Sequence, residues 1–119
     1  MTFEEMFSVV KQTLVQADLS QVHTNLAVQV NITGQGAGVF YAALQNGHLS
    51  VQPKPYRGYD VKLTASANDF IAMLQGRLNV VGAFTSGRLR IDGNFKKAME
   101  LKQIIEAIGR KNQQGRRRR

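Results

Sequence analysis

The sequence predicts an α+β fold of two layers, in which a five-stranded, mostly antiparallel sheet is covered on one face by helices. Three observations lead to this prediction. Five short segments alternate apolar and polar side chains, as strands with one buried face do. Segments with helical spacing of apolar residues stand before and after these strands. A length of 119 residues without cysteine fits one domain whose core needs no disulfide.

The first part of the chain predicts a helix and then a strand. Residues 2–17 begin with Thr2 and Glu5, whose spacing is that of a capping box, and continue with one apolar stripe at helical spacing. Over residues 24–32 the apolar side chains occupy every second position instead. This period of two predicts a strand with one dry face and one wet face.

A hairpin and a fourth strand are expected next. Asn46-Gly47 is typical of a two-residue hairpin turn, which would pair a strand over 39–45 with another over 49–52. The prolines of "PKPYRGY" end that strand, and residues 61–65 alternate again. The glycine-rich "TGQGAG" is interpreted as a turn, because a phosphate-binding loop would lead into a helix and this segment leads into a strand.

The second half predicts helices and one more strand. The pattern "SAND" opens a helix that Gly76 ends, and "NVVGAF" predicts a short helical turn. Glycines bracket a fifth strand over residues 88–92 in "GRLRIDG". Asn94 then caps a last helix that runs to Ile108.

The charge divides the chain into two parts. Residues 1–108 hold 10 Lys and Arg and all 8 acids, a net charge of +2, whereas residues 109–119 hold six basic residues and no acid. We therefore expect a domain over 1–108 and a basic, disordered tail over 109–119. The tail could simply be solvated and disordered, or it could contact anionic lipid. Non-specific nucleic-acid binding is a third interpretation, which is disfavoured because the domain offers no aromatic platform for bases. The lipid-contacting residues would be Arg116, Arg117, Arg118 and Arg119.

No pattern of catalytic or metal-binding residues emerges. His23 and His48 have no nearby carboxylate in the sequence and are interpreted as surface histidines. The eight acids include no ExxE or DxD pair. We therefore expect a non-catalytic protein without metal or cofactor. The N-terminus lacks the pattern of a signal peptide and no stretch is long and apolar enough to cross a membrane, so we expect a cytoplasmic location.

From about Leu26 to Ile108 the chain resembles the sterol carrier protein 2 family. The segments "NDFIAMLQGRLN", "AFTSGRLRIDGN" and "KAMELKQI" stand where the family has a helix, its glycine-bracketed strand and its final helix, and the hairpin "LQNGHLSVQP" also fits. The resemblance implies that "GRLRIDG" completes the sheet. It also implies an apolar tunnel between sheet and helices that takes fatty acids, acyl-CoA, phospholipids, sterols or isoprenoids.

The resemblance makes apolar residues of the second half candidate ligand contacts. Methionines suit an adaptable apolar surface, and the last helix is apolar over a wide arc. The same side chains would also suit an ordinary filled core. The candidate ligand-binding residues are Phe70, Met73, Leu74, Phe84, Leu89, Ile91, Met99, Leu101, Ile104, Ile105 and Ile108.

Two functions follow from these observations. The first is non-catalytic lipid binding and transfer, with a lipid or acyl chain as partner. The second is an accessory module with a filled core, which forms a homodimer or assists an enzyme of lipid or quinone metabolism.

Overall fold

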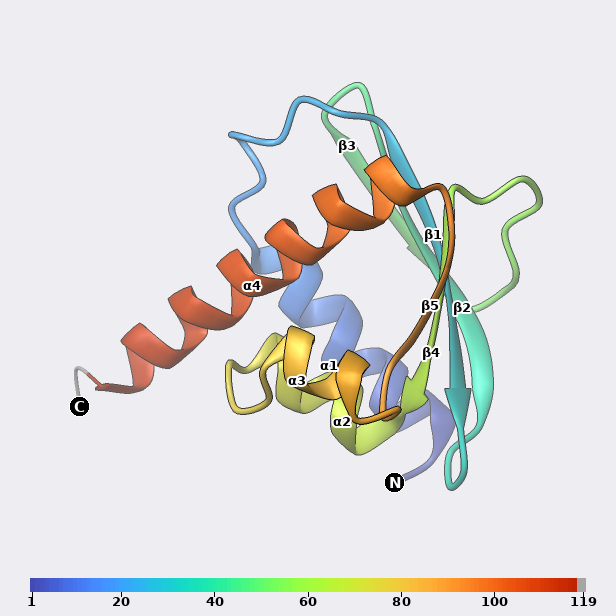
Figure 1. Cartoon of the computed structure of the whole chain (residues 1–119), viewed down its shortest axis with the longest axis vertical. Coiled ribbons are helices and arrows are strands. Elements are labelled where there is room, and N and C mark those ends of the chain that lie inside the picture. Colours follow the sequence, from blue (N-terminus) through green and yellow to red (C-terminus); the bar gives the residue numbers. More distant parts are fainter. Residues whose placement is uncertain (118–119) are drawn as a thin grey trace.

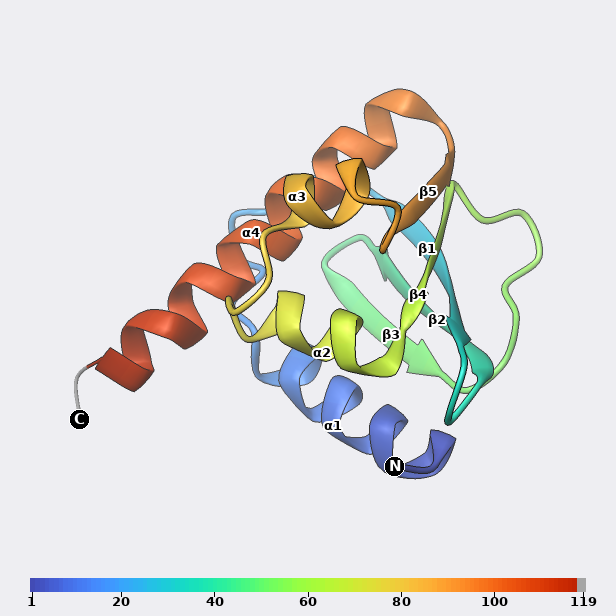
Figure 2. The ribbon, with the colours of Figure 1, turned by 60° about the horizontal axis from the view of Figure 1, so that its bottom comes forward.

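The computed structural model describes the backbone of residues 1–117 and the side chains of residues 1–112. Within this part of the chain, one five-stranded sheet forms one layer and four helices form the other (Figures 1 and 2). All four helices lie on the same face of the sheet. The predicted α+β fold of two layers is therefore confirmed.

The sheet has the strand order β3-β2-β1-β4-β5. Neighbouring strands are antiparallel except for β1 and β4, which run parallel, so the predicted mostly antiparallel sheet is confirmed. The strands are β1 (Leu26–Thr33), β2 (Gly38–Gln45), β3 (His48–Gln52), β4 (Val61–Ser66) and β5 (Arg90–Gly93).

The parallel pair requires the chain to return from β3 to the start of β4. The connecting loop is held against the outer face of the sheet by Tyr56, whose ring packs on Tyr41 with centroids 4.8 Å apart. The backbone N–H of Tyr56 also donates to Oε1 of Gln29 on β1, at 3.1 Å. The polar face of the sheet thereby receives the return loop, and the apolar face is left for the helices.

Three of the four helices begin at caps that the sequence predicts. The four helices are α1 (Phe3–Gln16), α2 (Ala67–Leu74), α3 (Val80–Thr85) and α4 (Phe95–Arg117). Thr2 and Glu5 form a complete capping box, and the Ser66 hydroxyl accepts from the Asp69 N–H at 3.2 Å. Asn94 Oδ1 accepts from the N–H of Lys97 at 2.9 Å.

The last helix is longer than predicted. We expected it to end at Ile108, with a disordered tail after it, but α4 continues to Arg117. Gly109 is not a stop signal, because its bare Cα lets α4 approach α2: a Cβ there would lie 2.9 Å from the Met73 carbonyl oxygen. The Asn112 side chain then donates to the Leu74 carbonyl at 2.7 Å. Arg118 and Arg119 lie outside the described residues.

The glycine-bracketed strand also differs at its start. β5 begins at Arg90 where the sequence predicted residue 88, because the backbone N–H groups of Arg88 and Leu89 both bond to the Ala83 carbonyl at the end of α3. At the other end, Gly93 has φ +126°, and a Cβ would collide with the Asp60 carbonyl oxygen.

Asp60 joins three elements at this point. It exchanges two hydrogen bonds with Ala27 of β1, one through its backbone N–H (2.9 Å) and one through its carboxylate (2.8 Å). Its carbonyl accepts from the N–H of Asn94, the residue before α4, at 3.0 Å. The start of α4 is thereby fixed relative to the middle of the sheet.

Candidate functional site

A small apolar pocket lies between the inner face of the sheet and the helices. Its volume is about 70 Å³, and every side chain that lines it is hydrophobic. The sheet supplies one wall, and the end of α1, the loop after it, α2 and α4 supply the rest. The lining residues are Leu14, Leu19, Leu26, Val28, Val30, Phe40, Ala42, Leu44, Leu49, Leu63, Phe70, Leu74, Leu101, Ile104, Ile105 and Ile108.

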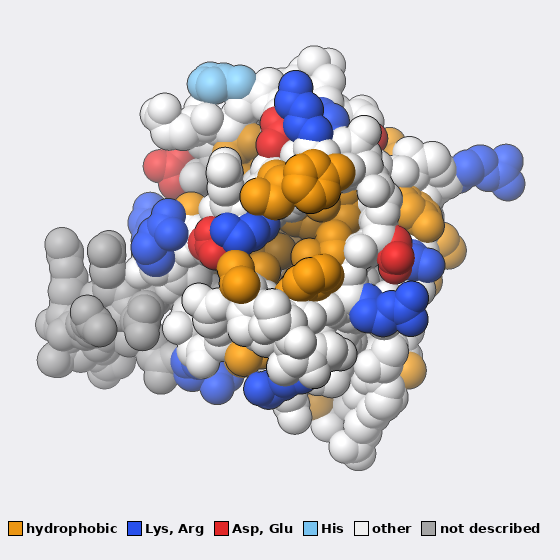
Figure 3. Space-filling model, viewed as in Figure 1, with side chains coloured by type: hydrophobic (Ala, Val, Ile, Leu, Met, Phe, Trp, Pro, Cys, Tyr) orange, Lys and Arg blue, Asp and Glu red, His pale blue; other side chains and the backbone are white. Residues whose placement is uncertain are grey.

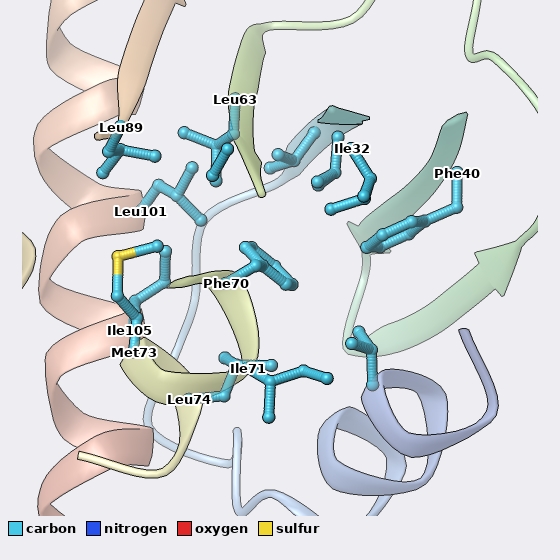
Figure 4. Packing of buried hydrophobic residues seen from close by; sticks show 14 of the residues in the cluster. Ile32, Phe40, Leu63, Phe70, Ile71, Met73, Leu74, Leu89, Leu101 and Ile105 are labelled. Atoms are coloured by element: carbon cyan, nitrogen blue, oxygen red, sulfur yellow. The ribbon is translucent and has the colours of Figure 1, made fainter. Parts of the chain in front are cut away.

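Strand alternation creates the sheet wall. Side chains two positions apart on a strand point to the same face, so β1 and β2 both place apolar side chains on the helix side. Phe40 of β2 is fully buried. Its ring meets Phe70 of α2 edge to face, with centroids 5.8 Å apart. This contact connects the two layers at the base of the pocket (Figure 4).

α4 supplies the opposite wall by helical spacing. Leu101, Ile104, Ile105 and Ile108 stand at positions i, i+3, i+4 and i+7, which share one face of a helix. Figure 4 shows side chains from β4, α2 and α4 converging on the same space. Since α4 is fastened near its start through Asn94 and near Gly109 and Asn112, this wall is held at both ends.

Six of the eleven predicted ligand-binding residues line this pocket. These are Phe70, Leu74, Leu101, Ile104, Ile105 and Ile108.

The other five predicted residues lie elsewhere. Met73 and Leu89 are almost fully buried but pack in the core beside the pocket, and Ile91 is half-buried on β5. Phe84 and Met99 lie outside this pocket and are 52% and 41% exposed, on α3 and α4. The wide apolar arc of α4 therefore faces both the pocket and the solvent.

The sequence interpretation missed the sheet wall. Its candidates came from the second half of the chain, whereas Val28, Val30 and Phe40 come from the first. The signal was available, because the alternation over residues 24–32 already marked the dry face on which Val28 and Val30 lie. Leu14 also belongs to the apolar stripe of the first helix.

The loop between α1 and β1 forms part of the pocket wall through Leu19. Two wide depressions in the surface, of about 900 and 800 Å³, adjoin the pocket on either side of this loop. Leu19 is the residue that lines the pocket and both depressions. Displacement of the Leu19 side chain would therefore join the apolar pocket to both depressions.

Polar groups fix this loop to α4 at the rim. The amino group of Lys97 donates to Thr24 Oγ1 at 2.8 Å and to the Asn25 carbonyl. Asn25 Oδ1 in turn accepts from the Asn46 N–H at 2.9 Å. The nearest acid is Glu100, whose carboxylate lies 3.9 Å from the Lys97 amino group. The rim is therefore polar, while the pocket behind it is entirely apolar.

The site contains no group that would perform chemistry. The lining side chains have no acid, base or nucleophile. Among the described residues, no cluster of three His, Cys, Asp or Glu side chains could hold a metal ion. Outside the pocket, the hydrogen bond from Arg88, 2.7 Å long, lowers the pKa of Asp69. The arrangement can hold an apolar molecule.

An α+β fold with an apolar pocket between a five-stranded sheet and one helical layer defines a class of small two-layer domains. The chain belongs to the SCP-2 sterol transfer family, whose model matches residues 3–106. This match confirms the resemblance seen in the sequence and extends it to α1.

Three known proteins illustrate the relationship. Hydroxysteroid dehydrogenase-like protein 2 of Bos taurus is 30% identical over 91% of this chain, and the match spans 26% of that protein. The structure of palmitated SCP2L2 from Aedes aegypti superimposes with a TM-score of 0.65 at 22% identity, covering 88% of this chain and 95% of that one. The UbiJ-SCP2 ubiquinone synthesis protein gives 0.63 at 14% identity, covering 89% and 94%.

The lengths limit what these relatives indicate. The chain spans about a quarter of the length of the bovine relative, so it corresponds to one part of that protein. The two solved structures are below 25% identity and show that the fold is shared.

Proposed function

We propose that this chain binds one lipid or acyl chain between the sheet and α4 and carries it without chemical conversion. Candidate ligands are fatty acids, acyl-CoA, phospholipids, sterols and isoprenoids. The observation that carries the proposal is the wholly apolar wall described above, which both layers contribute. The family match and the palmitated state of the Aedes aegypti relative support it.

The physical basis of binding is burial of apolar surface. Each methylene that leaves water gains about 0.8 kcal/mol, so ten of them gain about 8 kcal/mol before the costs of association. The pocket wall has no hydrogen-bonding side chain that could select one headgroup. Selection would therefore depend on the length and shape of the apolar part.

The pocket has to enlarge to take such a ligand. Its volume of about 70 Å³ is several times below the roughly 300–1,000 Å³ of ordinary ligand pockets. α4 is fastened at its start and near Gly109 and Asn112, whereas the α1–β1 loop lies between the two open depressions. We propose that outward movement of this loop, with Leu19, opens the space.

A second candidate function is an accessory module with a filled core. The small pocket volume favours it, and the structural similarity to a ubiquinone synthesis protein agrees with it. In this case the chain would dimerise or bind an enzyme of lipid or quinone metabolism through its surface, without a lipid between the layers.

Native mass spectrometry of the freshly purified chain separates the two candidates. Lipid transfer predicts adducts with the mass of a fatty acid, phospholipid or isoprenoid, or their appearance after incubation with fatty acid, acyl-CoA and sterol. A bare mass throughout would refute it and favour the accessory module.

A matched pair of variants shows where the ligand lies. Ala42→Leu adds volume inside the pocket and should abolish the adducts, whereas Ala37→Leu adds the same side chain at an exposed turn and should preserve them. Equal adducts in both variants would place the ligand outside this pocket.

A further inference from the structure

The α1–β1 loop, residues 17–25, is tied to the rest of the domain at its ends and not in its middle. Among the described residues, the hydrogen bonds of residues 18–23 all stay within the loop. The Asp18 carboxylate, for example, accepts from the N–H and the hydroxyl of Ser20, at 3.1 and 2.7 Å. The middle of the loop can therefore move away from the sheet and the helices without losing a hydrogen bond to either.

Lys97 ties the end of this loop to α4. Its amino group donates to Thr24 Oγ1 at 2.8 Å and to the Asn25 carbonyl, and the Glu100 carboxylate lies 3.9 Å away. The Thr24 hydroxyl also reaches Glu100 Oε1, at 3.4 Å. The Lys97 side chain is only 27% exposed. Hydrogen bonds from a charged donor are stronger than those between neutral groups, so these contacts are the firmest attachment of the loop to α4.

α4 does not depend on Lys97 for its own position. The start of α4 is held independently by a hydrogen bond from the Asn94 backbone N–H, 3.0 Å long. Asn25 is also held from the other side, because its Oδ1 accepts from the Asn46 N–H of the β2–β3 turn at 2.9 Å. Loss of the Lys97 contacts would therefore release Thr24 and the loop before it, while α4 and Asn25 stay in place.

Leu19 connects this loop with the pocket. Its side chain lines the apolar pocket and the two depressions between which the loop lies. Thr24 follows five residues later, and no hydrogen bond to another described element holds the residues between them. Segments with so few external hydrogen bonds open locally, at a small part of the free energy of global unfolding. Release of Thr24 therefore allows Leu19 to leave the pocket wall.

We propose that Lys97 is a latch that holds the α1–β1 loop, and with it Leu19, at the pocket wall and so sets the rate at which a lipid enters and leaves. The proposal rests on the proposed lipid binding and adds the residue that controls it. Lys97 lines the outer depression and not the apolar pocket, so it has no contact with a ligand in the pocket. Because the latch stabilises the closed loop with and without ligand, its loss should raise both rates and leave the dissociation constant nearly unchanged.

The test is stopped-flow exchange of a fatty acid that carries an anthroyloxy fluorophore. Lys97→Met removes the donors and keeps the length of the side chain, and we expect association and dissociation both to become about tenfold faster. Lys97→Arg keeps charged donors and should restore most of the slow exchange. Lys96→Met is the matched control, because Lys96 is exposed and forms no ion pair with any described residue. It should exchange the fatty acid as wild type does.

A change in the dissociation rate alone would overturn the latch. Faster dissociation of the fatty acid from Lys97→Met with unchanged association would raise the dissociation constant. Lys97 would then be a contact of the ligand itself, such as a partner of its carboxylate, and not a residue that acts through the loop.

A competing route for the ligand is visible in Figure 3, where hydrophobic side chains surround a hollow at the centre of one face. A ligand that entered through this hollow would not have to pass the α1–β1 loop. Its association and dissociation would then keep wild-type rates in Lys97→Met, and this result would also overturn the latch.

Limited proteolysis without lipid tests the latch even if the chain binds no fatty acid. Chymotrypsin needs the Leu19 side chain in its own pocket, so cleavage into fragments 1–19 and 20–119 follows the open population of the loop. This cleavage should be about tenfold faster in Lys97→Met than in Lys96→Met. Cleavage at Phe40, which is fully buried and reports global unfolding, should be equal in both variants.

The two measurements fail separately. Equal cleavage after Leu19 in Lys97→Met and Lys96→Met would overturn the latch, whether or not the chain binds lipid. Faster cleavage of Lys97→Met in a chain that takes up no fatty acid would support the latch on the loop and refute the proposed lipid binding.

Discussion

Replacing Gly109 with Ala tests how α4 packs, because the structure places this glycine inside a helix and against another backbone. A Cβ at this position would lie 2.9 Å from the Met73 carbonyl oxygen and 3.1 Å from the Gly76 Cα. Both neighbours are backbone atoms, so relief requires movement of α4 away from α2. Overpacking of this kind costs about 1–3 kcal/mol.

Gly82→Ala is the matched control. Gly82 also lies inside a helix, but a Cβ there would meet only the Asn79 side chain, at 3.6 Å. Both substitutions gain about 1 kcal/mol of helix propensity. The difference between the two variants therefore isolates the overpacking cost. We expect Gly82→Ala to be as stable as wild type or more so, and Gly109→Ala to be about 1–3 kcal/mol less stable than Gly82→Ala.

Urea unfolding followed by far-ultraviolet circular dichroism measures this difference. Thermal unfolding should show it too, at about 4 °C in Tm per kcal/mol for a domain of this size. If Gly109 stood in a disordered tail, its replacement would leave stability nearly unchanged. A Gly109→Ala variant as stable as Gly82→Ala would therefore refute the packing of α4 on α2.

Three other predictions concern the loop, an ion pair and the last strand. Leu19→Ala should speed the exchange of a fluorescent fatty acid about tenfold in stopped-flow measurements, because the side chain that closes the pocket loses its burial; an unchanged rate would mean that the ligand enters elsewhere. Asp69→Asn should destabilise the chain above about pH 4, since the pKa of Asp69 is lowered in the folded state and its stabilisation is lost as pH falls through that value; a loss of stability that does not change with pH would contradict this. Gly93→Ala should cost at least about 2 kcal/mol in urea unfolding, because its positive φ is strained for Ala and its Cβ meets the Asp60 carbonyl; near-wild-type stability would show that this turn is adaptable.

Local features of the fold could be predicted because their signals are local. The hairpin at Asn46-Gly47 forms as expected, with φ of +52° and +83°, since few residues other than Asn and Gly adopt this conformation. Thr2, Ser66 and Asn94 cap helices because their side-chain oxygens accept from N–H groups within the next turn.

Features that depend on distant contacts could not be predicted in the same way. The parallel pairing of β1 with β4 has no signature within either strand. Gly109 looks like a helix stop until α2 is seen beside it. The outward position of Phe84 and Met99 was missed for a related reason. The apolar character of a side chain does not show which layer it packs against, or whether it packs against any layer.

The fastening of α4 at both ends has a kinetic consequence. Asp60 and Asn94 hold its start, and Gly109 and Asn112 hold it against α2. Access to the pocket would then depend on a small excursion of the α1–β1 loop, which is a nanosecond-to-microsecond motion, and would not wait for the much rarer unfolding of the whole domain. The chain could thus be thermodynamically robust and still exchange cargo rapidly, because the two properties reside in different segments.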